Sequence, residues 1–486
     1  MAPFNLFFLL HLLFIPASGY VQPFEDGFIS GVISNKGLDF AKDLLVEKGI
    51  ESIVLLKLPE IENSAQVSLV GTAKVVLSDI TIKDVQVNSS TSLRIGESGI
   101  VVVVSGATAD LSMKWKYTVS SWLIPIGISD SGTASIKVKG MQVGLTLNLK
   151  NQDQEGRLKL SLLDYGCYVG DLSIKLDGGA AWLYQLLVDA FEDNIASSVE
   201  EGISGKIKEG ITKLDNVLQA LPKQISLDET AALNVSFVGN PVLSNSSVAI
   251  AINGLFTRTS DILAPQNYKK GYKVSSACGG LPKMMKISIH ENVFKSASLV
   301  YFNAGKMQLI IDELPDQAFL NTAEWRFIVP QLYKRYPNDD MQINVSASSP
   351  PFIQVGYQDI GATVSVDITI NVLEGGEAIP VACISVDISA SCSVEILGNN
   401  IAGRIRLQNF SAYLKWSKIG KLRIHLIQSL VSSALKTIVV PYLNRQLKSG
   451  YPLPTVDDYG LQNSIILYNY PWISVCSDAS FIEEDY

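Results

Sequence analysis

The chain has 486 residues, a formal net charge of −8, 47% hydrophobic residues and only 18% charged residues. This length is enough for two or more domains with sizeable cores, and the composition excludes a disordered chain. The acidic balance argues against a broad nucleic-acid-binding surface, so any anionic ligand has to meet a local basic patch.

The first residues predict a secretory signal peptide. An apolar run, Phe4–Ile15, is followed by small residues at 17–19, so we expect residues 1–19 to be removed and the mature chain to begin near Tyr20. The run is too short to span a bilayer, and no later segment has eighteen uninterrupted apolar residues. We therefore expect a soluble protein that is secreted to the extracellular space.

Two helices are predicted in the first half. One runs from about Lys36 to Lys48. A second, long helix is indicated by apolar residues that recur every three or four positions from Leu183 to Leu221, and Pro222 ends it. Glycines at 202, 205 and 210 weaken the middle of this helix and favour a bend there.

Long strands with one buried face are predicted by apolar residues at every second position. The clearest examples cover residues 134–149, 364–372 and 386–396. Between the two halves, residues 257–275 are polar and contain Pro265 and Gly271, so we interpret them as a linker. A helix is then expected over 315–336, strands over 342–414, and a closing helix over 422–448 that Pro441 kinks.

Five cysteines are too few for a disulfide scaffold, and the odd number leaves at least one unpaired: Cys167, Cys278, Cys383, Cys392 and Cys476. Cys383 and Cys392 are not expected to pair, because nine residues along one strand separate them by roughly 30 Å. Buried free thiols in a sheet are the favoured interpretation. Export is supported by five Asn-x-Ser triplets, which predict glycosylation at Asn88, Asn234, Asn245, Asn344 and Asn409.

Catalytic and metal-binding motifs are missing from the sequence. The mature chain has two histidines, His290 and His425, and the sequence contains no CxxC pair, HExxH, P-loop or Gly-x-Ser-x-Gly elbow. We therefore expect no enzymatic activity, no catalytic residue, no metal and no cofactor.

Three stretches, far apart but in a fixed order, carry a family resemblance. They are Ser34–Ala41, then Arg335–Asn338 with Gln342–Pro351, and finally Leu447–Pro454. Together they resemble the lipid-binding family of bactericidal/permeability-increasing protein and lipopolysaccharide-binding protein, and the divergence suggests a plant-type member.

The resemblance implies an α+β fold shaped as a boomerang. Two twisted antiparallel β-barrel modules, each with two helices, would be joined by a central sheet, and each module would hold a phospholipid's acyl chains in an apolar pocket. In this chain the modules would cover residues 20–256 and 276–486. The family's first arm has one disulfide, and Cys167 matches its first cysteine. No cysteine stands near 199–202 to complete it, so a link from Cys167 to Cys278 remains open.

The predicted lipid pocket of the first arm rests on helical spacing and on the family plan. The residues chosen lie on the two predicted helices: Leu38, Ala41, Leu45, Leu183, Leu187 and Phe191. Simple core packing is the alternative interpretation for most of the apolar residues along the long helix.

A basic and aromatic tip is predicted on the first arm. Lys114-Trp115-Lys116 matches a Lys-Trp-Lys of the segment that meets lipopolysaccharide phosphates in animal relatives, and its expected neighbours are Lys74, Lys83, Arg94 and Trp122. Lysines suit phosphate and an indole suits the boundary between polar and apolar phases. The alternative is an ordinary strand with solvated lysines. The apolar stretch after Trp122 departs from the family, whose animal members are rich in basic residues there.

These observations favour a secreted lipid-binding protein that recognises bacterial lipopolysaccharide through lipid A and phosphates, in innate immune sensing. The expected partners are lipopolysaccharide, phospholipid and, transiently, a membrane surface, with no nucleic acid; the sequence does not indicate a receptor. The alternatives are a carrier of endogenous phospholipid or other apolar lipids, and a structural adhesion protein whose modules are filled.

Overall fold

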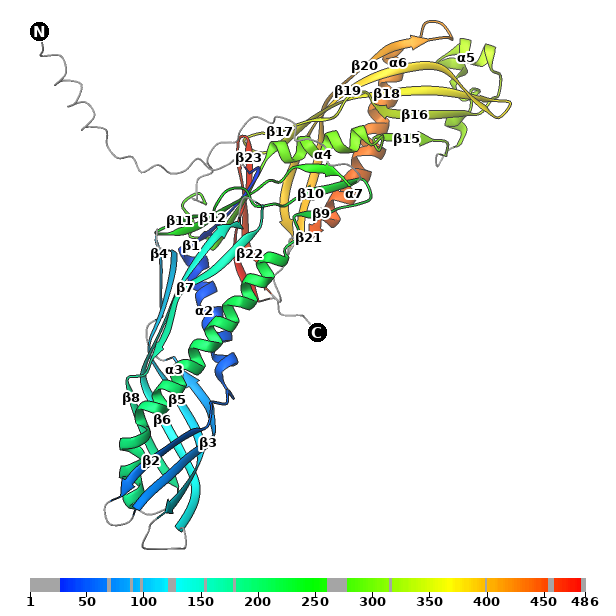
Figure 1. The fold of residues 1–486 in the computed structure, drawn as a ribbon. Coiled ribbons are helices and arrows are strands. Elements are labelled where there is room, and N and C mark those ends of the chain that lie inside the picture. The colour runs from blue at the N-terminus through cyan, green and yellow to red at the C-terminus, as the bar shows by residue number, and fades with distance from the viewer. Residues whose placement is uncertain are drawn as a thin grey trace, which may run out of the picture.

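A computed structural model shows an elongated molecule with a sheet-and-helix arm at each end and a sheet between them (Figure 1). The residues that the structure describes are 27–67, 71–87, 91–96, 99–120, 128–152, 155–177, 181–259, 278–313, 317–397, 400–452 and 459–481. The predicted signal peptide, Asn88 and Trp122 lie outside them.

The first arm is built from long antiparallel strands, as the alternation predicts. The chain enters through β1 (Ile29–Ser34) and α2 (Asn35–Ile53) and leaves through α3 (Ala181–Ala220). Between the helices lie β2 (Ile61–Val67), β3 (Gly71–Gln86), β4 (Thr91–Gly96), β5 (Gly99–Ser120), β6 (Ile128–Asn151), β7 (Leu158–Tyr168) and β8 (Asp171–Asp177).

The sheet of this arm is open, so the expected closed barrel is wrong for the described residues. Its strands run β2-β3-β5-β6-β7, with β4 paired to β5 and β8 paired to β6, and β2 and β7 end the row without pairing to each other. The side chains of α3 cover the β7 edge: Glu200 accepts a hydrogen bond from the amide of Val169, and Asp215 accepts one from Leu160, both at 2.8 Å. A helix therefore satisfies backbone groups that a barrel would pair with another strand.

Helix α3 is continuous over 40 residues. Four residues on its first half, Phe191, Ile195, Val199 and Ile203, pack into the core cluster of the arm. Gly202 lets the Leu58 side chain approach the helix closely, since a Cβ would lie 2.6 Å from its Cδ2 methyl and would have to displace it. Glycine thus permits close packing at this point rather than a break in the helix.

The central sheet combines strands from both halves of the chain, as expected. Its order is β11-β12-β1-β14-β23-β22, and β1 and β14 pair antiparallel in its middle. The strands are β11 (Val242–Ser244), β12 (Ser247–Ile252), β14 (Met285–His290), β22 (Tyr459–Asn469) and β23 (Trp472–Phe481). A small separate sheet is formed by β9 (Gln224–Ser226), β10 (Ala231–Asn234) and β13 (Phe256–Arg258), which flank β11 and β12 in the chain.

The second half repeats the plan of the first. Strand β1 leads into α2, and β14 leads in the same way into α4 (Glu291–Asn303). Helix α4 was not predicted from the sequence. His290 caps it: its Nδ1 accepts a hydrogen bond from the Asn292 N–H at 3.0 Å. The order helix, strands, helix is therefore confirmed, but its first helix in this half is α4.

The helix expected over 315–336 is wrong in extent. Only short turns form there: η2 (Gln317–Leu320), η3 (Glu324–Phe327) and α5 (Pro330–Arg335). Thr322 ends the first turn because its hydroxyl is fully buried and donates to the Tyr336 carbonyl, at 2.7 Å. Pro330 cannot donate a hydrogen bond inside a helix but fits at the first turn of a new one.

The second arm carries the remaining strands on a single open sheet. Its order is β15-β16-β18-β19-β20-β21, with β17 paired to β18. The strands are β15 (Gln308–Ile311), β16 (Met341–Ala347), β17 (Phe352–Val355), β18 (Ile360–Glu374), β19 (Glu377–Leu397), β20 (Asn400–Ser417) and β21 (Tyr451–Pro452).

The closing helix is confirmed and is irregular where Pro441 lies. It consists of α6 (Ile424–Ala434), a π-helical turn η4 (Leu435–Val439) and α7 (Val440–Ser449). Asn444 on α7 pairs with both backbone groups of Ile405, accepting from its N–H at 2.7 Å and donating to its carbonyl at 3.0 Å. The amide thus imitates a strand at the β20 edge, as α3 does at β7.

One disulfide joins Cys278, ahead of β14, to Cys476 on β23. The link from Cys167 to Cys278 that the sequence left open is therefore wrong. Cys167, Cys383 and Cys392 are free, as predicted for the last two. Of the predicted linker over 257–275, residues 257 and 258 belong to β13 (Phe256–Arg258), and 260–275 lie outside the described residues.

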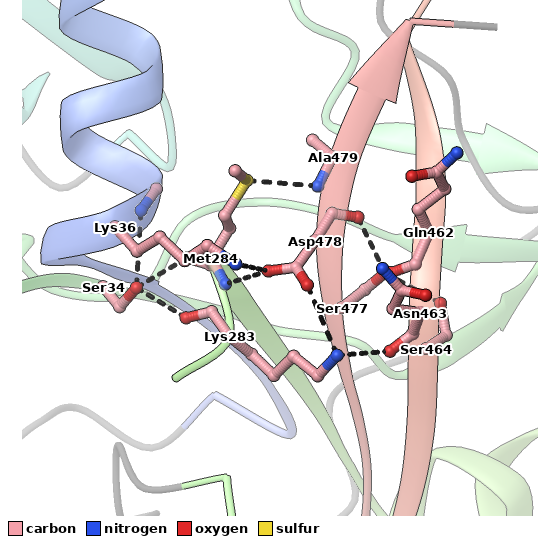
Figure 2. Close-up of polar contacts among 11 residues, drawn as sticks. Ser34, Lys36, Lys283, Met284, Gln462, Asn463, Ser464, Ser477, Asp478 and Ala479 are labelled. Atoms are coloured by element: carbon pink, nitrogen blue, oxygen red, sulfur yellow. Dashed lines mark hydrogen bonds and ion pairs between the residues drawn. The ribbon is translucent and has the colours of Figure 1, made fainter. Parts of the chain in front are cut away.

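Polar contacts fasten the start of α2 to the central sheet (Figure 2). Asp478 on β23 accepts hydrogen bonds from Lys36 at 2.8 Å, from Met284 N at 3.1 Å and from Lys283 at 3.3 Å. Burial acts to raise the pKa of Asp478, but these hydrogen bonds outweigh it and hold the pKa below its ordinary value. The carboxylate therefore stays charged and ties three segments together.

This junction explains the stretch Ser34–Ala41. Ser34 caps α2 and also donates to the Lys283 carbonyl, at 2.6 Å. A Cβ on Gly37 would lie 2.4 Å from the carbonyl oxygen of Met284, so only glycine fits. The first of the three stretches that carry the resemblance thus helps to join the two halves of the chain.

Candidate functional site

The predicted pocket residues of the first arm are not gathered in one place. Leu38 is buried in a cluster with Ile95 and Val248, beside the central sheet. Phe191 is 1% exposed and belongs to the core of the long strands. Ala41 is half-buried and Leu45 is exposed. Core packing accounts for Leu38 and Phe191, and lipid contact by this set stays a prediction.

The side chains of Leu183 and Leu187 lie outside the described residues. Apolar surface is instead left open on the second half of α3. Ile207, Ile211, Leu214 and Leu218 are half-buried, and Val217 is 61% exposed. The stripe packs tightly from Phe191 to Ile203 and is covered only partly by the protein toward its end.

The second arm leaves more apolar surface open, on its closing helix. Ile438, Val439, Tyr442 and Leu443 are all exposed. By length and composition the stretch Ile424–Lys448 would be apolar enough to cross a membrane, and only 6% of its most apolar window is buried. These properties are weak evidence for a membrane-spanning helix. In the structure this helix lies along β20, and Asn444 binds it to that strand.

A pocket of about 400 Å³ opens on the same arm between β17, β18, β19 and β20. Hydroxyl-bearing side chains and one carboxylate, Asp387, line it together with the rings of Phe352 and Phe410. Ser365 donates to Asp387 at 2.6 Å. This lining offers hydrogen bonds, and it contains no histidine or lysine.

No group suited to metal binding or covalent catalysis is found in the part of the chain that the structure describes. It contains no cluster of three or more His, Cys, Asp or Glu that could hold a metal ion. Burial and, secondly, the charge of Glu200 raise the pKa of Cys167 to about 12, so its thiol is unreactive. Burial lowers the pKa of His290, whose Nδ1 is occupied as a helix cap.

Three predicted lysines do share one outer face of the first arm. Strand pairing places Lys74 opposite Thr118, Val76 opposite Lys116, and Ser78 opposite Lys114. Two of the three are neutralised: Lys74 pairs with Glu62 at 2.6 Å and Lys114 with Asp79 at 2.7 Å. Lys116 has no ion pair with any described residue.

The hydrogen bond and the charge of Asp79 raise the pKa of Lys114, and Lys114 lowers the pKa of Asp79 in return. An anionic ligand would have to compete with these carboxylates. The face is therefore basic in composition but only partly free to bind phosphate.

Trp115 points into the arm, so its prediction as an exposed aromatic at the tip is wrong. It is 1% exposed, its Nε1 donates to the Thr133 carbonyl at 3.1 Å, and it stacks on Tyr117. Its ring covers Gly132, where a Cβ would lie 2.7 Å away. The reason is strand alternation: if Lys114 and Lys116 face solvent, Trp115 must face the core.

Arg94 and Lys83 do not complete the cluster. Arg94 pairs with Val101, thirteen residues before Lys114 on β5, which is roughly 40 Å along the strand. The expectation that Arg94 neighbours the tip is therefore wrong. Lys83 is exposed at an irregular pairing of β3 near Leu111, between the two ends.

The described sequons occupy different surroundings. Asn245 is exposed in the turn between β11 and β12, and Asn409 is exposed on β20. Asn234 lies at the end of β10. Asn344 lies inside β16, which is paired on both sides, and its Oδ1 is buried without a hydrogen-bond partner. Glycosylation of these residues remains a prediction.

Comparison with known proteins matches both halves of the chain. Residues 37–221 match the N-terminal domain of the LBP / BPI / CETP family, and residues 225–470 match its C-terminal domain. A BPI/LBP family protein of Arabidopsis thaliana is 47% identical over 458 residues, which cover 94% of this chain and 93% of that protein.

More distant relatives also align over most of their length. The bactericidal permeability-increasing protein of Sebastes schlegelii is 26% identical and covers 92% of this chain and 94% of its own. A crystal structure of lipopolysaccharide binding protein, 19% identical, superposes with a TM-score of 0.61 over 94% of this chain and all of that one. That likeness shows a shared fold, and the matched domains with the plant relative show the family. The chain belongs to the LBP / BPI / CETP family.

Proposed function

We propose that this protein is a secreted, non-enzymatic lipid-binding protein that recognises bacterial lipopolysaccharide in innate immune sensing. The observation that carries the lipid-binding part is the apolar surface that the protein leaves open on one long helix of each arm. Val217 on α3 and Tyr442 on α7 are each 61% exposed, although both helices lie along a sheet. An acyl chain would cover what the protein does not.

Burial of acyl chains supplies the driving force in this proposal. Each buried CH₂ contributes about 0.8 kcal/mol, so two acyl chains can offset the cost of ordering the ligand. Relatives named for lipopolysaccharide binding support that ligand class. The phosphates of lipid A would meet the outer face of Lys74, Lys114 and Lys116, where Lys116 is the cation without an ion pair among the described residues.

The test is a titration of the purified mature protein with rough and smooth lipopolysaccharide, at low and at physiological salt. Binding that weakens with salt is expected, because a phosphate contact is screened while apolar burial is not. Failure to bind either form at low salt would contradict lipopolysaccharide recognition.

The second candidate is a carrier of endogenous phospholipids or other apolar lipids. It is favoured by the extent of open apolar surface in the second arm, which does not need a phosphorylated head group. Solvent extraction of the purified protein should then yield roughly one phospholipid per occupied arm, and vesicle-to-vesicle transfer should be measurable. Extractable lipid without lipopolysaccharide binding would make the protein a carrier and remove the immune role.

A further inference from the structure

Exposed aromatic rings gather at the far end of the second arm, where α5 lies in Figure 1. Phe327 is 76% exposed and Phe319 is 53% exposed, on the turns before α5. Trp416, at the end of β20, is 37% exposed. Rings of this size are normally buried, and their grouping at one end points to a surface that meets another phase or partner.

A β-bulge turns Trp416 outward. Ile384 pairs with Leu414, but Cys383 pairs with Trp416, so Lys415 is an extra residue on β20. Leu414 packs in the core of the arm together with Ile384. Regular alternation would place Trp416 on that same inner face, and the inserted residue moves it to the opposite one.

Cations accompany these rings. Residues 416–425 contain Lys418, Lys421 and Arg423 and no Asp or Glu. The turns and α5 add Arg326, Lys334 and Arg335. Within the described part of the chain none of these six forms a salt bridge. In a protein of net charge −8, this is a local cluster of six cations without salt bridges.

The cations and the rings form one surface. Arg335 donates to the Lys418 carbonyl at 3.2 Å, and Leu332 on α5 shares a core cluster with Ile419 and Leu422. Lys418 lies 5.7 Å from the ring centre of Trp416, and Arg326 lies 4.7 Å from that of Phe327. The acidic residues at this end are Glu324, Asp339, Asp340 and, on the hairpin between β18 and β19, Glu374 and Glu377. None of them forms a salt bridge with the six cations among the described residues, and Asp340 accepts a hydrogen bond from Asn321.

We propose that this distal surface, made by η3, α5 and residues 416–423, docks on an anionic phospholipid bilayer. Aromatic rings favour the boundary between head groups and acyl chains, and Lys and Arg beside them meet the phosphates. This charge complementarity favours a lipid surface, which offers many phosphates to cations that have no carboxylate of their own. Helix α6 begins directly behind this surface at Ile424, so docking would bring the open apolar helix of the arm near the membrane.

The experiment is co-sedimentation of the full mature chain with vesicles of phosphatidylcholine alone and of phosphatidylcholine mixed with phosphatidylglycerol. The wild type should bind the mixed vesicles more tightly, and salt should weaken that preference. The variant K418Q/K421Q/R423Q should lose about fivefold in affinity per charge at low salt. The variant F319A/F327A should lose about tenfold at any salt concentration.

A control on the first arm is K150Q/K159Q, at two exposed lysines of β6 and β7 outside the proposed lipopolysaccharide face, which should bind the mixed vesicles like the wild type. Brominated lipid should quench Trp fluorescence in the wild type and less in W416F, a readout that follows contact rather than stability. Wild-type protein that ignores anionic vesicles would overturn the proposal. The proposal would also be overturned if the control variant lost vesicle binding while both distal variants kept it.

The inference goes beyond the proposed function and can fail separately from it. Distal variants that lose vesicle binding but still bind lipopolysaccharide support docking as a separate step. A wild type that binds vesicles but not lipopolysaccharide contradicts the proposed immune role and leaves the docking surface intact.

Discussion

Two tryptophans, each beside a lysine near the end of a long strand, differ in burial between the two arms. Trp115 is enclosed by its own sheet, and its neighbour Lys114 is neutralised by Asp79. Trp416 is turned outward by a bulge. Its strand neighbour Lys415 is also neutralised, by Asp367, but Lys418, 5.7 Å from the ring centre, has no salt bridge among the described residues. Similar residues therefore give a core in one arm and an interaction surface in the other, because strand register decides which way each ring points.

The largest expected effect is the loss of stability when Trp115 is replaced. Trp115→Ala should destabilise the protein by about 3–5 kcal/mol, because it leaves a cavity over Gly132 and removes the hydrogen bond to the Thr133 carbonyl. Trp416→Ala should change the unfolding free energy by about 0.5 kcal/mol or less, as for other surface residues. Denaturant unfolding of both variants measures the difference. Equal losses would mean that the two rings are equally buried.

The disulfide tests whether the two halves depend on their common sheet. Cys278→Ser should lower the free energy of unfolding by about 2–4 kcal/mol, because the disulfide restricts the unfolded chain by closing a loop with a sequence separation of 198. Cys392→Ser, at a free thiol, is the control and should cost less. Thermal unfolding under oxidising conditions checks both variants. A reducing agent should lower the melting temperature of the wild type and leave that of Cys278→Ser unchanged.

Asp478 makes the same junction sensitive to acid. Its pKa is lowered in the folded state, so its contribution is present above the ordinary value of 3.8 and is lost as the pH falls through the lowered pKa. Asp478→Asn should lower the free energy of unfolding by about 1–3 kcal/mol at neutral pH, since Lys36 and Lys283 lose the carboxylate with which both form ion pairs. Unfolding measured across acidic pH should show a shallower loss of stability in this variant. A parallel pH dependence would assign the acid sensitivity to other carboxylates.

The smallest expected effect distinguishes the lysines of the first arm. Lys116→Glu should weaken lipopolysaccharide binding about fivefold or more at low salt. Lys114→Glu should weaken this binding less, because Asp79 already neutralises the charge of Lys114. Neither change should move the melting temperature measurably. An equal effect of both would mean that the ligand displaces Asp79.

Much of the fold can be predicted from the sequence alone. Alternation over residues 134–149, 364–372 and 386–396 determines β6, β18 and β19, because a strand with one buried face needs that period. The apolar spacing after Leu183 determines α3 and its end at Pro222. The ordered stretches at Ser34–Ala41 and Leu447–Pro454 indicate the family, which the domain matches confirm.

Other features were decided by tertiary contacts. Helix α4 depends on a cap from His290 and on burial beside the central sheet, and its β-branched and aromatic residues do not predict it locally. The open sheet edges depend on Glu200, Asp215 and Asn444 reaching from helices, and the disulfide depends on which strands meet. Exposure of Trp416 depends on one inserted residue, and ion pairing of Lys114 depends on a carboxylate 35 positions away. A local pattern fixes the period of an element, but contacts between distant segments fix its partner and the face it presents.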